Sequence, residues 1–180
     1  MSNSSTSSPR RALTPKRLAR CGMIAAVYVV LCLALAPFSY GAVQVRVAEM
    51  LTLLPVFGPE YIVGVTIGCL LSNFIGSTLI DVVFGTLATL LACLVTYRLR
   101  NIRIRGLALP AAIPPVLFNA VIIGIEISVF FSDTAATLPV MLWNGFTVGI
   151  GEVISCMILG VALVRLIESN TSLRKVFVDQ

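Results

Sequence analysis

One short stretch of the sequence, residues 44–55, carries several of the side chains best suited to chemistry. Gln44, Arg46 and Glu49 stand there among apolar neighbours. Arg46 and Glu49 are three residues apart, so on a helix they would share a face and neutralise each other. At membrane depth, ionisable groups are costly unless they pair, line a cavity or meet a ligand. The stretch therefore predicts either one wall of a solute-binding site or a structural ion pair at the membrane interface.

The composition places these residues in a membrane. Of the 180 residues, 58% are hydrophobic and 12% are charged, whereas a soluble domain carries about 25% charged residues. The mean hydropathy is +1.00. The apolar runs are long and unbroken, which favours helices over the short alternating strands of a barrel. We predict an all-α, polytopic helical bundle in the plasma membrane, as in a bacterial inner membrane.

Several kinds of chemistry are excluded by what the sequence lacks. It has no histidine, which rules out histidine-based triads, metal sites and proton relays. Its five cysteines form no CxxC pair and lie in or beside apolar runs, where a thiol packs as a small hydrophobic group. The basic residues behind the +5 net charge form three clusters beside apolar runs, which indicates membrane orientation rather than nucleic-acid binding. We expect no catalytic residue, metal site or cofactor in this chain, and no enzymatic activity.

Turn signals divide the apolar sequence into six segments. The predicted segments are residues 21–38, 43–57, 60–76, 79–97, 107–131 and 140–166. Four segments separate the first two basic clusters and two separate the last pair, so every cluster can be cytoplasmic. We therefore predict about six transmembrane helices with both termini in the cytoplasm. Residues 43–57 are short for a bilayer, which needs about 20 residues, so a full crossing there stays open.

This topology divides the chain into three parts. Residues 1–20 are Ser-rich and then basic, which predicts a disordered cytoplasmic tail. Residues 21–168 form the predicted transmembrane bundle, and residues 169–180 form a cytoplasmic C-terminal tail.

Polar residues from five segments gather in the outer leaflet under this topology. Hydrogen bonds made only for structure would be scattered through both leaflets, so the gathering predicts a pocket open to the exterior. Two members have a structural alternative, because Asp81 could cap its helix and Trp143 could anchor the membrane interface. The predicted substrate-binding residues are Gln44, Arg46, Glu49, Asn73, Asp81, Asn119, Glu126, Trp143, Asn144 and Glu152.

The charges of these residues also limit the ligand. Four carboxylates outnumber Arg46, which favours a cation or a solute rich in N–H donors. A carboxylate accepts two parallel N–H bonds, and an asparagine amide both donates and accepts. Aromatic side chains that could stack on a flat ring are Phe74, Phe118, Trp143 and Phe146. A purine-like base that carries an amine would satisfy this set.

Active transport by this chain would need partner subunits, because the sequence has no GxxxxGK[ST] phosphate loop with which to use ATP. Gly22, Ala25 and Ala26 form a small-residue patch on the first segment, where such a partner could dock. Ordinary packing against a neighbouring helix is the alternative. A second row of small residues, open to the same two interpretations, is Gly64, Gly68, Ser72 and Gly76.

The pattern Gln44-x-Arg46-x-Ala-Glu49-x-Leu-Thr52-Leu-Leu-Pro55 resembles the signature region of the queuosine-precursor transporter (QueT) family. The similarity continues through four further blocks, at residues 68–73, 81–91, 119–126 and 151–152. It covers nearly the whole chain after the N-terminal tail, and several blocks in order are more specific than one.

The resemblance implies a substrate-binding (S) component of an energy-coupling factor (ECF) importer. Such components are six-helix proteins that capture a micronutrient from outside and work with a transmembrane coupling (T) subunit and two ATPase subunits. An AxxxA-type motif on the first helix meets the T subunit; here Gly22-Met-Ile-Ala-Ala26 has glycine at the first position. The implied substrate is a queuosine precursor of the 7-deazaguanine class, such as the aminomethyl form.

Three other functions compete with this one. A standalone carrier for a similar solute would couple transport to an ion through Glu126 or Glu152. An intramembrane enzyme would use Glu/Asp pairs, but the sequence offers no nucleophile and base for it. A membrane scaffold would not need polar residues gathered in one leaflet.

Overall fold

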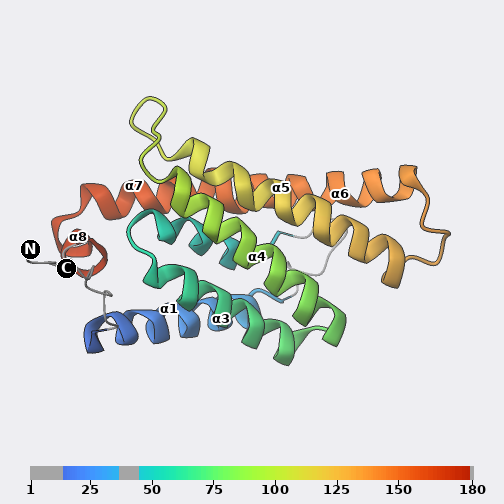
Figure 1. Cartoon of the computed structure of the whole chain (residues 1–180), viewed down its shortest axis with the longest axis horizontal. Helices are drawn as coiled ribbons and strands as arrows, with labels where there is room; N and C mark the ends of the chain where they lie inside the picture. The colour runs from blue at the N-terminus through green and yellow to red at the C-terminus, as the bar shows by residue number, and fades with distance from the viewer. Residues whose placement is uncertain (1–13, 37–44, 179–180) are drawn as a thin grey trace, which may run out of the picture.

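The computed structural model describes residues 14–36 and 45–178, and helices make up nearly all of them (Figure 1). Along the chain they are α1 (Pro15–Ala34), η1 (Val47–Val56), α3 (Glu60–Gly76), α4 (Leu79–Leu99), α5 (Leu109–Glu126), η2 (Ile127–Phe131), α6 (Leu138–Glu152), η3 (Val153–Gly160), α7 (Val161–Ser169) and α8 (Thr171–Phe177). The helix η1 is a 3₁₀-helix, whereas η2 and η3 are π-helical continuations of α5 and α6. The predicted all-α class is confirmed.

Four of these helical stretches are long and apolar enough to cross a membrane: Pro15–Ala34, Leu79–Leu99, Leu109–Phe131 and Leu138–Ser169. They match the first, fourth, fifth and sixth predicted segments. The second and third segments appear as the shorter apolar helices η1 and α3. The chain is therefore a helical membrane protein, while six full crossings and cytoplasmic termini stay predictions.

The short helix η1 lies inside the bundle. It packs against η3, α4 and α1, and most of its side chains are buried. Ten residues at the 3₁₀ rise of about 2 Å each span about 20 Å. The hydrocarbon core of a bilayer is about 30 Å thick, so the described helix alone does not cross it. The helix instead places Glu49 and Thr52 in the interior of the protein.

The row of small residues on α3 brings α1 close. A Cβ atom added at Gly64 would lie 2.9 Å from the carbonyl oxygen of Cys21, and one at Gly68 would lie 2.7 Å from the Cβ of Tyr28 and 3.1 Å from the Cα of Ala25. The interpretation as ordinary internal packing is confirmed for Gly64 and Gly68. It also buries Ala25, which therefore does not belong to an exposed patch.

Gly22 and Ala26, on the flank of α1 next to Ala25, are exposed. The separation from Ala25 arises because successive helical residues point about 100° apart at 3.6 residues per turn. An added Cβ at Gly22 would meet no atom within 4 Å among the described residues. The role of Gly22 and Ala26 in a partner interface stays a prediction.

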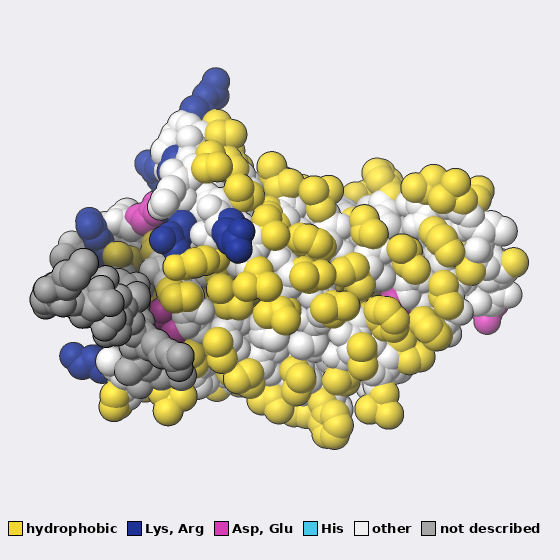
Figure 2. Space-filling view, viewed as in Figure 1, with side chains coloured by type: hydrophobic (Ala, Val, Ile, Leu, Met, Phe, Trp, Pro, Cys, Tyr) yellow, Lys and Arg dark blue, Asp and Glu magenta, His cyan; other side chains and the backbone are white. Residues whose placement is uncertain are grey.

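The two ends of the molecule differ in charge. Figure 2 shows Lys and Arg side chains gathered at one end of the visible face, with hydrophobic side chains over most of the rest. The positive-inside rule predicts that this basic end is the cytoplasmic one. The C-terminal helix α8 packs against this end, since the Tyr61 hydroxyl donates to the carbonyl of Phe177 at 2.9 Å and their rings stack. The described part of the predicted C-terminal tail is therefore helical and attached to the bundle.

Candidate functional site

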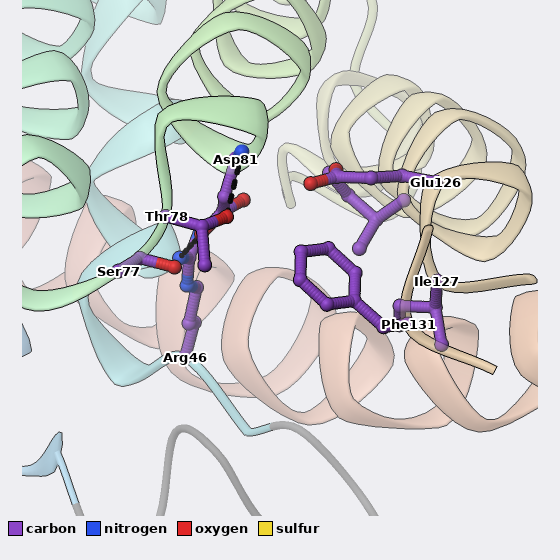
Figure 3. Close-up of a pocket in the computed structure, with 8 residues that line it drawn as sticks. Arg46, Ser77, Thr78, Asp81, Glu126, Ile127 and Phe131 are labelled. Carbon is purple, nitrogen blue, oxygen red and sulfur yellow. Dashed lines mark hydrogen bonds and ion pairs between the residues drawn. The ribbon is translucent and has the colours of Figure 1, made fainter. Parts of the chain in front are cut away.

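A cavity of about 250 Å³ opens where the start of η1, the start of α4 and the end of α5 meet (Figure 3). In Figure 3, Arg46 and Asp81 face Glu126 across the space, and the ring of Phe131 lies between the two sides. The lining residues are Arg46, Ser77, Thr78, Asp81, Ile123, Glu126, Ile127 and Phe131. Three residues predicted from the sequence thus share one cavity.

Arg46 is held by two partners from neighbouring helices. Its Nη2 donates to Oδ2 of Asp81 at 2.8 Å and to Oδ1 of Asn73 at 2.7 Å. The Asn73 amide nitrogen in turn donates to the backbone carbonyl of Asp81 at 3.1 Å. Gly85 makes room for this cluster, because a Cβ there would lie 2.7 Å from both Asn73 Nδ2 and Asp81 Oδ1. Arg46, Asn73 and Asp81 form what we call the paired side of the site.

The predicted ion pair between Arg46 and Glu49 is wrong. Arg46 precedes η1 and has an extended backbone, with φ −82° and ψ 90°, so the three-residue spacing does not bring the two side chains together. Arg46 pairs with Asp81 instead. Oε1 of Glu49 accepts hydrogen bonds from the hydroxyls of Tyr28 and Thr89. The sequence left open that Asp81 caps its helix. The cap of α4 is instead Thr78, whose hydroxyl accepts a hydrogen bond from the Asp81 N–H at 3.3 Å.

Glu49 belongs to a second group of polar residues, which is buried in the bundle. Its side chain is only 1% exposed, and it lies close to Glu152, which also lies close to Asn119. The thiol of Cys156 is 3.1 Å from Oε2 of Glu152 and 3.3 Å from the backbone carbonyl of Glu49. Residues from η1, α5 and the α6–η3 helix therefore meet at one buried place.

Several buried polar atoms of η1, α5 and η3 lack a hydrogen-bond partner within the described chain. They are Oε2 of Glu49, Nδ2 of Asn119, Oε2 of Glu126 and Oγ of Ser155. Leaving such an atom unsatisfied costs about 1–3 kcal/mol. Further unpartnered atoms belong to Glu60, Thr66, Thr86 and Arg103, so burial alone does not mark the site. Asn119 and Glu126 on α5 and Ser155 on η3 form what we call the open side.

The remaining predicted site residues lie elsewhere. Trp143 is 66% exposed and contacts Phe146 on the outer surface, which agrees with a membrane-interface anchor. Asn144 donates to the Ser128 hydroxyl at 2.9 Å and thereby links α6 to η2. Gln44 lies outside the described residues. Phe74 and Phe146 are likewise exposed, so they do not face the cavity.

Sequence reasoning missed the aromatic residue that does line the cavity, Phe131. It follows Glu126 in the π-helix η2, and nothing in its sequence context distinguishes it from the other apolar residues. Tyr28 was also missed, although a buried tyrosine hydroxyl normally finds a partner and this one lies within an apolar helix. Both Glu126 and Glu152 directly precede a π-helical stretch, a feature frequent at functional sites.

Comparison with known proteins identifies relatives of this chain. The family model described as QueT transporter matches residues 18–169. The queuosine precursor transporter QueT of Lactococcus lactis subsp. cremoris (strain MG1363) is 47% identical over 70 residues, which are 38% of this chain and 41% of that protein. No solved structure gives a significant match. Because the family match spans most of the sequence, the chain belongs to the QueT transporter family.

Proposed function

We propose that this protein is the membrane-embedded substrate-binding subunit of an ECF-type importer in the plasma membrane. It captures a queuosine precursor of the 7-deazaguanine class, in its aminomethyl form, for uptake driven by partner subunits. The observation that carries the proposal is the cavity between Arg46–Asp81 and Glu126, together with the unpartnered buried atoms behind it. The family match and the name of the Lactococcus relative support a transported queuosine precursor rather than an enzymatic substrate.

The charges that line the cavity fit this solute. Asp81 already neutralises Arg46 through their 2.8 Å ion pair, which leaves the Glu126 carboxylate without a countercharge on the cavity wall. A carboxylate in a low-dielectric site is stabilised by a cation or by N–H donors. The cavity volume of about 250 Å³ lies below the range of about 300–1,000 Å³ typical for drug-sized ligands. It therefore suits a small base better than a nucleoside.

Energy for uptake would come from partners. A T subunit would dock on the exposed face of α1 that carries Gly22 and Ala26, since small residues let helices approach closely in a membrane. Two ATPase subunits would use the ATP, and this chain would need no cofactor of its own.

Binding of radiolabelled 7-aminomethyl-7-deazaguanine to the purified protein in lipid nanodiscs tests the proposal. We expect saturable binding that Glu126→Gln weakens strongly. Glu168→Gln serves as the matched control, because Glu168 pairs with Arg103 at the basic end, away from the cavity. Micromolar or weaker binding that Glu126→Gln leaves unchanged would overturn the proposal.

A standalone ion-coupled carrier is the second candidate, favoured by the buried carboxylates Glu49 and Glu152, whose charges influence each other. Uptake of the same solute by cells that lack ECF ATPase subunits separates the two functions. The importer subunit requires that uptake disappears without those subunits, whereas an ion-coupled carrier retains it and loses it when the ion gradient is dissipated.

A further inference from the structure

The cavity-facing stripe of α5 carries two polar groups at different depths. Asn119, Ile123 and Glu126 are spaced by four and three residues, so they lie on one face of the helix. Glu126 and Ile123 line the cavity, whereas Asn119, one turn before Ile123, is buried beside it and does not line the cavity. The seven residues from Asn119 to Glu126 correspond to about 10 Å along the helix axis. The open side therefore offers polar groups at two separate places.

The upper place is suited to an ammonium group. Glu126 is the carboxylate on the cavity wall that the arginine does not bind, and its Oε2 has no partner in the described chain. Its carboxylate points into the cavity, with the ring of Phe131 beside it (Figure 3). An ammonium there gains a charge-assisted hydrogen bond and a nearby aromatic ring.

The lower place is suited to the edge of a flat, N–H-rich ring. Glu49 offers one free carboxylate oxygen and Asn119 a free amide nitrogen within the described residues. Glu152 adds a second carboxylate close to both. Acceptors beside a donor match an edge that presents adjacent N–H groups and a carbonyl. Ile123 lies between the two places and offers an apolar surface for the face of the ring.

We propose that Glu126 recognises a primary ammonium on the substrate, while Glu49, Asn119 and Glu152 recognise the N–H-rich edge at the opposite end of its ring. This assignment rests on the proposed function and fixes the orientation of the ligand. It makes Glu126 the residue that selects the amine-bearing precursor over neutral analogues with the same ring.

Two ligands and two variants test the orientation. The ligands are 7-aminomethyl-7-deazaguanine and 7-methyl-7-deazaguanine, which share the ring edge and differ in the ammonium. We expect the wild-type protein to bind the aminomethyl ligand about 10- to 100-fold more tightly, as one charge-assisted hydrogen bond allows. Glu126→Gln should remove most of this preference, with little effect on the methyl ligand. Glu49→Gln should weaken both ligands by similar factors.

Each outcome has a separate meaning. A wild-type preference below about threefold would contradict the assignment without any variant, so a folding defect cannot hide the answer. If Glu126→Gln weakens the binding of both ligands equally, the proposed orientation is wrong. If Glu49→Gln weakens only the aminomethyl ligand, the orientation is reversed. The proposed function stands in both cases. Failure of the wild-type protein to bind either ligand would overturn the proposed function and the orientation together.

Discussion

The two sides of the cavity differ in how far the chain satisfies its own polar groups. On the paired side, Arg46, Asn73 and Asp81 bind one another through three hydrogen bonds of 2.7–3.1 Å. On the open side, Asn119, Glu126 and Ser155 each bury an atom that has no partner in the described structure. The paired side is satisfied by the fold itself, whereas we propose that a ligand satisfies the open side. Substitutions on the first should therefore change stability, and those on the second should change binding.

The largest effect on stability is expected from Asp81→Ala on the paired side. It leaves the guanidinium of Arg46, only 14% exposed, without its countercharge. Removing one member of a buried pair costs about 3–5 kcal/mol, and the remaining exposure of Arg46 favours the lower value. Thermal unfolding of the purified variant in detergent measures the loss.

Glu168→Ala is the matched control for this change. It removes the partner of Arg103 from an ion pair whose side chains are 28% and 36% exposed, and such surface pairs contribute about 0–1 kcal/mol. Equal destabilisation by Asp81→Ala and Glu168→Ala would show that the paired side contributes no more to folding stability than a surface ion pair.

Gly85→Ala should produce the next largest loss of stability. The new methyl group would lie 2.7 Å from Asn73 Nδ2 and Asp81 Oδ1, and overpacking of this kind costs about 1–3 kcal/mol. Gly149→Ala is the control, since its methyl group would meet Ala120 at an ordinary 3.5 Å. Unfolding temperatures of the two variants decide the question; a Gly85→Ala protein as stable as the control would mean that the cluster tolerates expansion.

A smaller loss is expected from Tyr28→Phe, which removes one hydrogen bond to Glu49 and keeps the ring in place. Glu49 retains Thr89 as a donor at 3.3 Å. The net contribution of one hydrogen bond is about 0.5–1.5 kcal/mol. Chemical unfolding in detergent would measure it, and a loss above about 3 kcal/mol would instead indicate that the buried Glu49 carboxylate depends on the Tyr28 hydroxyl.

The smallest effect on stability should come from the open side. Asn119→Leu replaces an amide whose nitrogen has no partner in the described chain by an apolar group of similar size. Removing such an atom is nearly neutral or stabilises by up to about 1 kcal/mol, while ligand binding should fall at least tenfold. Unfolding and binding measured on the same preparation compare the two effects. Strong destabilisation with unchanged binding would assign Asn119 to the structural framework.

Much of the fold could be predicted because the sequence is apolar and its breaks are marked by Gly, Pro and charged residues. All six predicted segments contain a helix, and the basic clusters lie at one end (Figure 2). The 3₁₀ geometry of η1 and the packing of α8 through Phe177 could not be predicted, because both depend on tertiary contacts.

The candidate site was predicted in part, for a physical reason. Polar residues such as Asn73, Asp81 and Glu126 are conspicuous in an apolar chain, and the topology places them near one another. The partner of Arg46 was predicted incorrectly because the residue lies outside the helix that the spacing assumed. Trp143 was expected at the site and is exposed, while Phe131 lines the cavity, because a helix that is apolar all round does not reveal which face meets lipid.

A structure of the protein bound to 7-aminomethyl-7-deazaguanine would test the central claim most directly. We predict that the ring lies between the two sides of the cavity, with its amine at Glu126 and its N–H-rich edge at Glu49 and Asn119. The Arg46–Asp81 ion pair should be the same in the bound protein as in the protein without ligand. A ligand bound elsewhere, with the buried atoms of Glu126 and Asn119 still unpartnered, would contradict the account.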